Sequence, residues 1–208
     1  GYEGFVKRYL VWKLIPYEIV VGDDFHFGRE HAGTAKLLKK LGALFGFQTT
    51  IIPVKSHRRK IISSSQIRRH IVAGDLNKAR RLLGHPVFLR GRVIYGDARG
   101  RKLGYPTANL RPPETILLPS GVFLVNIRFR NRLYHGLANI GRRPSFKTMS
   151  HVLVEVHIFN FQKKIYGKEI TIEFIKKIRD EKVFRCENEL IHQIKKDEKY
   201  AHAFFSLR

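Results

Sequence analysis

The sequence is poor in cysteine and contains no long uninterrupted apolar run. Its single cysteine, Cys186, excludes an internal disulfide and a zinc site built on several cysteines, as is typical of a reducing cytoplasm. No stretch approaches the roughly 18 apolar residues that a membrane-spanning helix requires. Residues 1–14 carry charges inside their apolar run, which excludes the core of a signal peptide. We therefore expect a cytoplasmic protein that does not bind membranes.

Acidic residues are also scarce. Seventeen Asp and Glu stand against 40 Lys and Arg, which gives a net charge of +23. This charge favours polyanions such as nucleic acid, anionic lipid or phosphorylated small molecules. The basic residues are nevertheless spread along the chain, with the densest cluster at residues 57–60, so a generally basic surface is the preferred interpretation. Because 43% of the residues are hydrophobic, we expect a packed core.

The first 84 residues alternate between helical and strand patterns. Helices are predicted over 5–14 and 36–45, with leucines 37, 38, 41 and 44 on one side of the second, and apolar strands over 17–21 and 49–54. Ser63 and Gln66 have the spacing of a capping box, and a further helix is predicted over 76–83. This rhythm indicates a doubly wound parallel sheet. With only two strands, we expect an incomplete α/β domain over residues 1–84, whose open sheet edge invites self-association.

The pattern changes after Pro86. Alternating strand-like segments follow over residues 87–95, 121–130, 132–139, 151–161 and 169–178, and Asn131 marks a tight hairpin. Short strands separated by turn residues indicate a small closed antiparallel barrel over residues 85–208. Residues 187–205 have a helical pattern, and Cys186 before them is a poor helix cap. The expected boundary between the two domains therefore lies near Gly84.

Residues 100–109, with the sequence Gly-Arg-Lys-Leu-Gly-Tyr-Pro-Thr-Ala-Asn, form the segment most informative about function. Glycines at 96, 100 and 104 let the backbone approach a polyphosphate. The Thr107 hydroxyl and the Asn109 carbonyl are hard oxygen ligands suited to Mg²⁺, which takes its other oxygens from phosphates and water. Taken alone, the segment could also be an ordinary loop.

Glu155 is the candidate general base. In the strand predicted over 151–161, Val152, Val154, Val156 and Ile158 share one parity, which places Glu155 on the opposite face together with His157. A carboxylate there could accept the proton of an alcohol, although a strand Glu can also simply face solvent. His157 is expected to be a hydrogen-bonded structural imidazole.

Five motifs in order resemble the riboflavin kinase family. They occupy residues 91–110, 137–146, 154–157, 165–168 and 178–184. The resemblance implies a six-stranded antiparallel barrel that phosphorylates riboflavin with ATP to give FMN. It implies that Thr107 and Asn109 serve Mg²⁺ and the ATP phosphates, and that Gly100, Lys102 and Gly104 of the same loop also bind the phosphates. It further implies that Glu155 is the base and that Arg179 lies in a flap near the flavin.

Two earlier segments resemble the FMN adenylyltransferase domain of the bacterial bifunctional enzymes. Residues 22–28 contain the matching positions Gly22, Asp24 and Phe25, beside the flavin-nucleotide site of that family. Residues 62–69 contain the positions that match its contact with ATP phosphates at a helix start: Ser63, Ser64, Ser65 and Arg68. Ser65 and Gln66 depart mildly from the family pattern, where Thr and Arg are more common.

The family's His-x-Gly-His motif has no counterpart among the ten histidines of this sequence. We therefore expect the chain to begin inside the adenylyltransferase domain, and FAD synthesis to require an intact parent protein. Two alternatives to the kinase remain open. The first is a basic barrel that binds nucleic acid, for which the sequence has no compact basic and aromatic motif. The second is a barrel that binds flavin without phosphorylating it.

Overall fold

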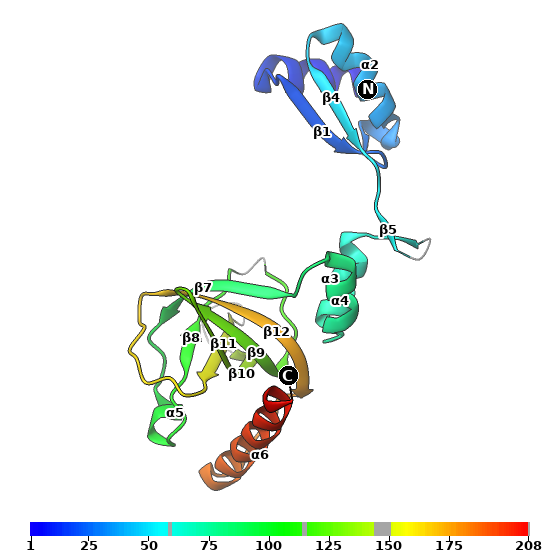
Figure 1. Cartoon of the computed structure of the whole chain (residues 1–208). Coiled ribbons are helices and arrows are strands. Elements are labelled where there is room, and N and C mark those ends of the chain that lie inside the picture. Colours follow the sequence, from blue (N-terminus) through cyan, green and yellow to red (C-terminus); the bar gives the residue numbers. More distant parts are fainter. Residues whose placement is uncertain (58–59, 114–115, 144–150, 208) are drawn as a thin grey trace. The chain divides into compact units, whose positions relative to one another are not determined.

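The computed structural model describes residues 1–57, 60–113, 116–143 and 151–207 (Figure 1). Arg58 and Arg59 of the basic cluster, and Pro144, Ser145 and Phe146 of the second kinase motif, lie outside these ranges. The contacts divide the chain into two compact units, Gly1–Ile62 and Ser63–Arg208. Their relative positions are not determined, so each unit is described by itself.

The first unit is built around a parallel pair of strands, as the sequence predicts. Strand β1 (Glu18–Gly22) pairs in parallel with β4 (Gln48–Ile52), and helix α2 (Ala35–Phe45) connects them. Two short antiparallel pairs, β2 (His26–Phe27) with β3 (Gly33–Thr34) and β5 (Ser56–His57) with β6 (Lys60–Ile61), complete the strands described here. The α/β assignment of this region is therefore confirmed.

Helices cover this pair of strands. The chain opens with α1 (Tyr2–Phe5) and a π-helix, η1 (Val6–Leu14), and a 3-10 turn, η2 (Arg29–His31), precedes α2. Thr34 caps α2 by accepting a hydrogen bond from the Leu37 amide, and Leu38 and Leu41 are buried. Leu44, predicted on the buried side, is 73% exposed, because its position on α2 faces away from the small core. That core contains Val6, Phe27, Leu38, Leu41 and Phe47.

The second unit begins with two helices, α3 (Ser64–Val72) and α4 (Leu76–Leu83). The Ser63 hydroxyl accepts a hydrogen bond from the Gln66 amide, which confirms the predicted cap. Leu76 and Ala79 of α4 are buried in the same cluster as the barrel core, so these helices pack with the barrel. The boundary near Gly84 marks the change in sequence pattern, and we keep it as a proposal for where the two sequence families meet.

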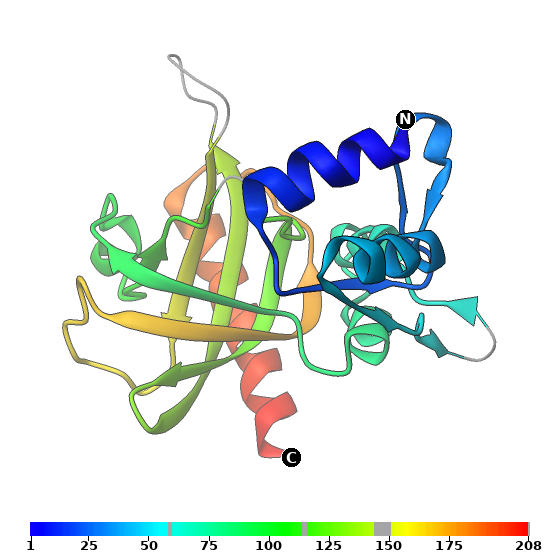
Figure 2. The same cartoon turned by 90° about the horizontal axis from the view of Figure 1, so that it is seen from above.

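Six antiparallel strands close into a barrel in the order β10, β11, β8, β7, β12, β9 (Figures 1 and 2). The strands are β7 (Phe88–Ile94), β8 (Ala108–Leu110), β9 (Gly121–Phe129), β10 (Arg132–Arg143), β11 (His151–Ile158) and β12 (Glu169–Arg179). A short helix, α5 (Arg99–Lys102), precedes β8. The predicted barrel is confirmed, and β8 is the strand that the periodicity missed.

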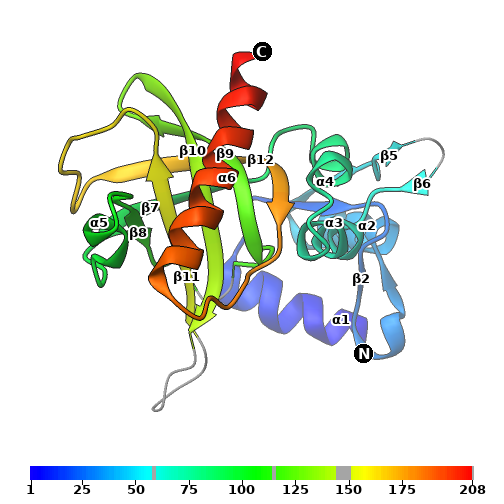
Figure 3. The same ribbon diagram turned by 90° about the horizontal axis from the view of Figure 1, so that it is seen from below.

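The barrel interior is tightly packed. Phe123, Val125 and Ile127 of β9, with Val154 and Val156 of β11, have no solvent exposure. Helix α6 (Glu187–Ser206) runs along the outside of the barrel across β9 and β10 (Figure 3). Under it lies a second apolar cluster, which includes Val122, Leu124, Leu137 and Ala201. Strand β9 is therefore buried on both faces.

In the part of the chain that the structure describes, no helix combines the length and the apolar character needed to cross a membrane.

Candidate active site

One cross-strand row on the outer face of the barrel contains three of the predicted site residues, Glu155, Asn109 and Arg179. Glu155 of β11 lies opposite Asn109 of β8 on one side and opposite Asn139 of β10 on the other. The row continues from Asn139 to Val122 of β9, and from Val122 to Arg179 of β12. Residues directly opposite each other in an antiparallel pair have Cβ atoms about 5 Å apart. Pairing register therefore brings Asn109 and Glu155, which are 46 residues apart in sequence, next to each other.

Glu155 faces away from the barrel core, as its parity predicted. Its neighbours Val154 and Val156 are fully buried inside the barrel, whereas Glu155 lies on the outer face and lines a cavity of about 320 Å³. We call this the helix-side cavity, because residues of α6 close one side of it. Its lining comes from the segment before β8, from β8 to β11, from the segment after β12, and from α6. The polar lining residues are Asp97, Tyr105, Thr107, Asn109, Asn139, Glu155, His157, Arg179, Glu181, Lys182 and Asp197.

Asn109 presents an oxygen without a partner. Its side chain is only 4% exposed, and the buried Oδ1 accepts no hydrogen bond from any described residue. A buried carbonyl oxygen of this kind is costly unless a ligand satisfies it. Thr107, two residues earlier, lines the same cavity. An orphaned amide oxygen and a nearby hydroxyl form a donor set that fits Mg²⁺.

Close packing requires glycine at positions 96 and 100, and the backbone conformation requires it at position 104. A Cβ on Gly96 would overlap the Asn109 amide, and a Cβ on Gly100 would overlap the Tyr105 carbonyl oxygen. Gly104 has φ +86°, a left-handed conformation that other residues rarely adopt. Gly100 lines the helix-side cavity, but Gly104 and Lys102 are exposed and are not among the described residues that line either cavity. Their phosphate contact stays a prediction.

His157 supports the loop that carries Thr107. Its Nδ1 lies 2.9 Å from the Pro106 carbonyl oxygen, and its ring stacks edge-on against Tyr105, with the centroids 5.6 Å apart. Its Nε2 lies 3.9 Å from Glu198 Oε1 on α6. Burial raises the pKa of the Tyr105 phenol, and the Glu198 carboxylate adds to the shift. The histidine is thus the hydrogen-bonded structural imidazole that the sequence suggested.

Arg179 reaches the helix-side cavity at the end of β12. Its Nε donates a 2.8 Å hydrogen bond to Asp197 Oδ2 of α6, and one terminal nitrogen donates to the Asp180 carbonyl oxygen at 3.0 Å. Its guanidinium carbon lies 5.9 Å from the centre of the Phe184 ring. The structure therefore brings Arg179 into one cavity with Glu155, Thr107 and Asn109. Arg179 is the last residue of β12 and not part of a flap after that strand, and its contact with the flavin stays a prediction. Asn139 and Asp197 are cavity residues that the sequence reasoning missed.

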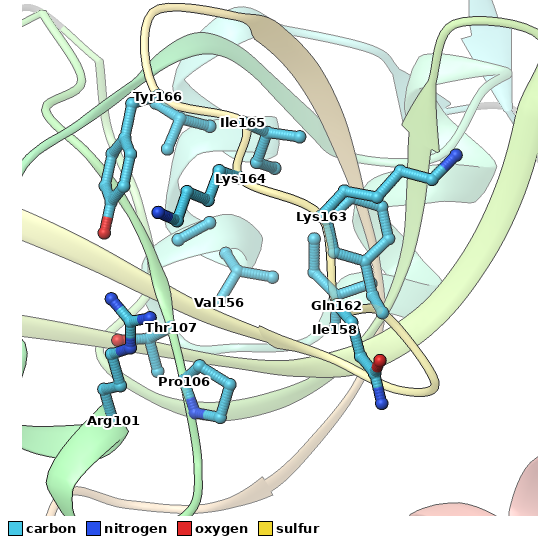
Figure 4. A pocket seen from close by; sticks show the side chains of 13 residues that line it. Arg101, Pro106, Thr107, Val156, Ile158, Gln162, Lys163, Lys164, Ile165 and Tyr166 are labelled. Carbon is cyan, nitrogen blue, oxygen red and sulfur yellow. The ribbon is translucent and has the colours of Figure 1, made fainter.

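A second cavity, of about 360 Å³, lies beside the first. We call it the loop-side cavity, because the segment between β11 and β12 forms one wall; Thr107 lines both cavities. Figure 4 shows the Arg101 and Lys164 side chains ending on the side where Tyr166 and Thr107 lie. Tyr166 stacks on Tyr95, with ring centroids 4.1 Å apart and planes 15° apart. Apolar side chains, among them Val93, Val156 and Ile165, form the floor.

The residues that match the adenylyltransferase motifs fall in different units. In the first, Gly22 ends β1, the Asp24 carbonyl oxygen lies 2.8 Å from His26 Nδ1, and Phe25 stacks on Phe27. In the second, Ser63 caps α3, and Ser64, Ser65 and Arg68 are exposed on its first turns. Their joint role in ATP and flavin-nucleotide binding stays a proposal.

Comparisons with known proteins agree with this architecture. The riboflavin kinase family model matches residues 83–205, and the FAD synthetase model matches residues 1–66. A bifunctional riboflavin kinase/FMN adenylyltransferase from Buchnera aphidicola subsp. Schizaphis graminum is 42% identical over 99% of this chain and 67% of its own length. The Listeria monocytogenes protein of the same name is 38% identical over 98% of this chain and 65% of its own length.

A solved structure from Streptococcus pneumoniae, which carries the name of a macrolide-efflux protein, is 34% identical to the chain. It superposes with a TM-score of 0.74 over 95% of this chain and 64% of its own. The chain thus spans about two thirds of the length of the curated relatives it matches. Five ordered kinase motifs, the closed barrel and these matches agree: the chain belongs to the family of bifunctional riboflavin kinase/FMN adenylyltransferases.

Proposed function

We propose that the barrel unit transfers the terminal phosphoryl group of ATP to the ribityl hydroxyl of riboflavin, giving FMN. The observation that carries the proposal is the junction at Thr107, where two cavities of different chemistry meet beside Glu155 and Asn109. Phosphoryl transfer needs two substrates held end to end, with a base at the acceptor and charge neutralisation at the donor.

The two cavities differ in charge, and we use this difference to assign one substrate to each cavity. The described lining of the loop-side cavity contains three cations, Arg101, Lys163 and Lys164, and no carboxylate. Three cations around a partly apolar pocket suit a nucleoside triphosphate. Tyr166 also lines this pocket, and its ring offers a contact for the adenine ring of ATP.

The helix-side cavity has the opposite balance. Its described lining contains the four carboxylates of Asp97, Glu155, Glu181 and Asp197 against the cations Arg179 and Lys182. An excess of carboxylates disfavours a triphosphate and accepts an uncharged, hydroxyl-rich flavin. We therefore place ATP in the loop-side cavity and riboflavin in the helix-side cavity.

Each residue at the junction then has a defined task. Glu155 accepts the proton of the ribityl hydroxyl, an effect typically worth about 10²- to 10⁴-fold in rate. Thr107 and Asn109 would hold Mg²⁺, which neutralises charge on the phosphates when it is bound. Asn109 is the direct cross-strand neighbour of Glu155, so the Cβ atoms of the base and of this metal ligand lie about 5 Å apart.

The test is direct. The chain is incubated with riboflavin, ATP and Mg²⁺, and the products are separated by chromatography. We expect FMN, and no FAD from this polypeptide, since its sequence contains no His-x-Gly-His motif. Flavin binding without FMN would favour the non-catalytic flavin-binding alternative.

The base is tested by Glu155→Gln, which should abolish FMN formation while riboflavin binding, followed by flavin fluorescence, remains measurable. The matched control is Glu169→Gln. Glu169 is an exposed strand carboxylate that pairs with Arg90, outside the described lining of both cavities. Full turnover by Glu155→Gln would refute the assignment.

A further inference from the structure

Helix α6 carries a buried carboxylate that the family motifs do not account for. Asp197 is 6% exposed, although the helix lies on the outside of the barrel. An ionised carboxylate is rarely buried to this extent unless it is paired and hydrogen-bonded. Asp197 lines the helix-side cavity together with Glu155 and Arg179.

Both oxygens of Asp197 are occupied. Oδ2 accepts the 2.8 Å hydrogen bond from Arg179 Nε, and only 15% of the Arg179 side chain and 7% of the Asp197 side chain are exposed. Oδ1 accepts a 2.8 Å hydrogen bond from Gln193 Nε2, one turn earlier on α6. Gln193 Oε1 in turn accepts a hydrogen bond from Lys182 at 3.2 Å. Hydrogen bonds thus join α6 to Arg179 at the end of β12 and to Lys182 in the segment that follows.

The backbone of β12 is shaped to deliver Arg179 to this position. Its pairing with β9 shifts register between Phe174 and Lys176, and again between Lys177 and Arg179. A bulge of this kind re-aims the side chains that follow it, and bulges are common beside active sites. The second shift ends at Arg179, which pairs with Val122 in the row that contains Glu155.

Docking of α6 does not rest on this ion pair alone. An apolar cluster that includes Val122, Leu124, Leu137 and Ala201 already joins the helix to the barrel. A buried ion pair contributes little net stability, because desolvation offsets most of its attraction. The network does fix the position of a guanidinium at the cavity wall.

We propose that Asp197 is a positioning residue for the flavin substrate, which makes α6 part of the kinase site. The proposal rests on the proposed function. Asp197, held by Gln193, fixes Arg179 in one orientation, so that riboflavin meets a preorganised wall. Without the carboxylate, Arg179 samples other rotamers and riboflavin binds a less ordered site. The loop-side cavity, which we assign to ATP, is lined by neither residue, so ATP binding should not change.

The experiment is a double-mutant cycle of Asp197→Asn and Arg179→Gln in the full chain, with KM measured separately for riboflavin and ATP. We expect Asp197→Asn to raise KM for riboflavin at least tenfold and to leave KM for ATP within twofold. In the Arg179→Gln background, Asp197→Asn should add less than twofold. Glu187→Gln, an exposed carboxylate on the same helix, is the control and should match the wild type.

Three results would overturn the proposal: an unchanged KM for riboflavin, equal losses for both substrates, or the same loss with and without Arg179. If Asp197→Asn does not fold, Gln193→Met keeps the carboxylate but removes its second donor, and should raise KM for riboflavin by a smaller factor. Riboflavin affinity measured by fluorescence completes the cycle without turnover. An absence of FMN from the wild type would therefore refute the proposed function, while the binding cycle would still decide the role of Asp197.

Discussion

Gly96 offers a way to move Asn109 without altering it. A Cβ built on Gly96 would lie 2.4 Å from Asn109 Nδ2 and 2.7 Å from its Oδ1, whereas ordinary contacts begin at 3.4 Å. In Gly96→Ala the amide must therefore retreat by about 1 Å or turn away. Since Asn109 is buried against β7 and β11, the added methyl group displaces it from its place beside Glu155.

The magnitude follows from the sensitivity of catalysis to geometry. A misplacement of about 1 Å costs roughly 10²-fold in rate, or about 2.7 kcal/mol of transition-state stabilisation. We expect kcat/KM for FMN formation to fall about 100-fold in Gly96→Ala, with a higher Mg²⁺ concentration needed for half-maximal rate. Asn109→Ala should give a comparable loss, because it removes the same oxygen.

Steady-state kinetics at several Mg²⁺ concentrations, combined with thermal unfolding, make the measurement. Gly4→Ala is the control, since a Cβ there meets no atom within 4 Å. If Gly96→Ala keeps its wild-type kcat/KM while Asn109→Ala loses activity, the new methyl group does not displace the Asn109 amide. If both variants stay fully active, Asn109 has no part in the reaction.

Three further predictions concern charge, pH and capping. Lys164→Glu should raise KM for ATP about tenfold and leave KM for riboflavin within twofold; equal effects on both would contradict the sorting of substrates by charge. The hydrogen bond with Lys78 lowers the pKa of Asp75, the N-cap of α4, so its stabilisation is present near neutral pH and is lost as the pH falls through the folded-state value. Asp75→Ala should therefore cost about 1 kcal/mol at pH 7 and progressively less in acid, as urea unfolding at several pH values would show. Cys186→Ser should raise the unfolding free energy by about 0.5–1 kcal/mol, because Cys186 is the N-cap of α6 and makes no side-chain cap hydrogen bond; an unchanged urea midpoint would count against it.

Most helices and strands were predicted because alternation and cap spacing depend on residues that are close together in the sequence. Alternation identified β7, β9, β10, β11 and β12, and the spacing from Ser63 to Gln66 located the start of α3. Strand β8 escaped because it has three residues, too few to show a period of two. All three of its residues are buried, since α6 and the loops cover the outer face. The six-strand count came from the family resemblance.

Site residues were predictable only where a motif contained them. Asn139 lies within a recognised motif, yet its place beside Glu155 depends on the register between β10 and β11. Asp197 stands in an otherwise ordinary amphipathic helix, and its partner Arg179 is 18 residues away. Two register shifts in β12 set that contact, and bulges leave no clear signature in a sequence. Self-association of the first unit stays a prediction.

The packed core explains why the proposed base and its neighbour Asn109 lie on the outer face of the barrel. Phe123, Leu110 and Ile172 fill the core at this level of the barrel, so a functional side chain beside them must have outward parity. Outward residues are normally solvated, and a solvated carboxylate is a poorly positioned base. Helix α6 and the segment after β12 cover this part of the outer face and convert it into a cavity. The proposed kinase site is therefore formed by the barrel and its covering helix together, and we expect a barrel without α6 to retain its core but lose its riboflavin affinity.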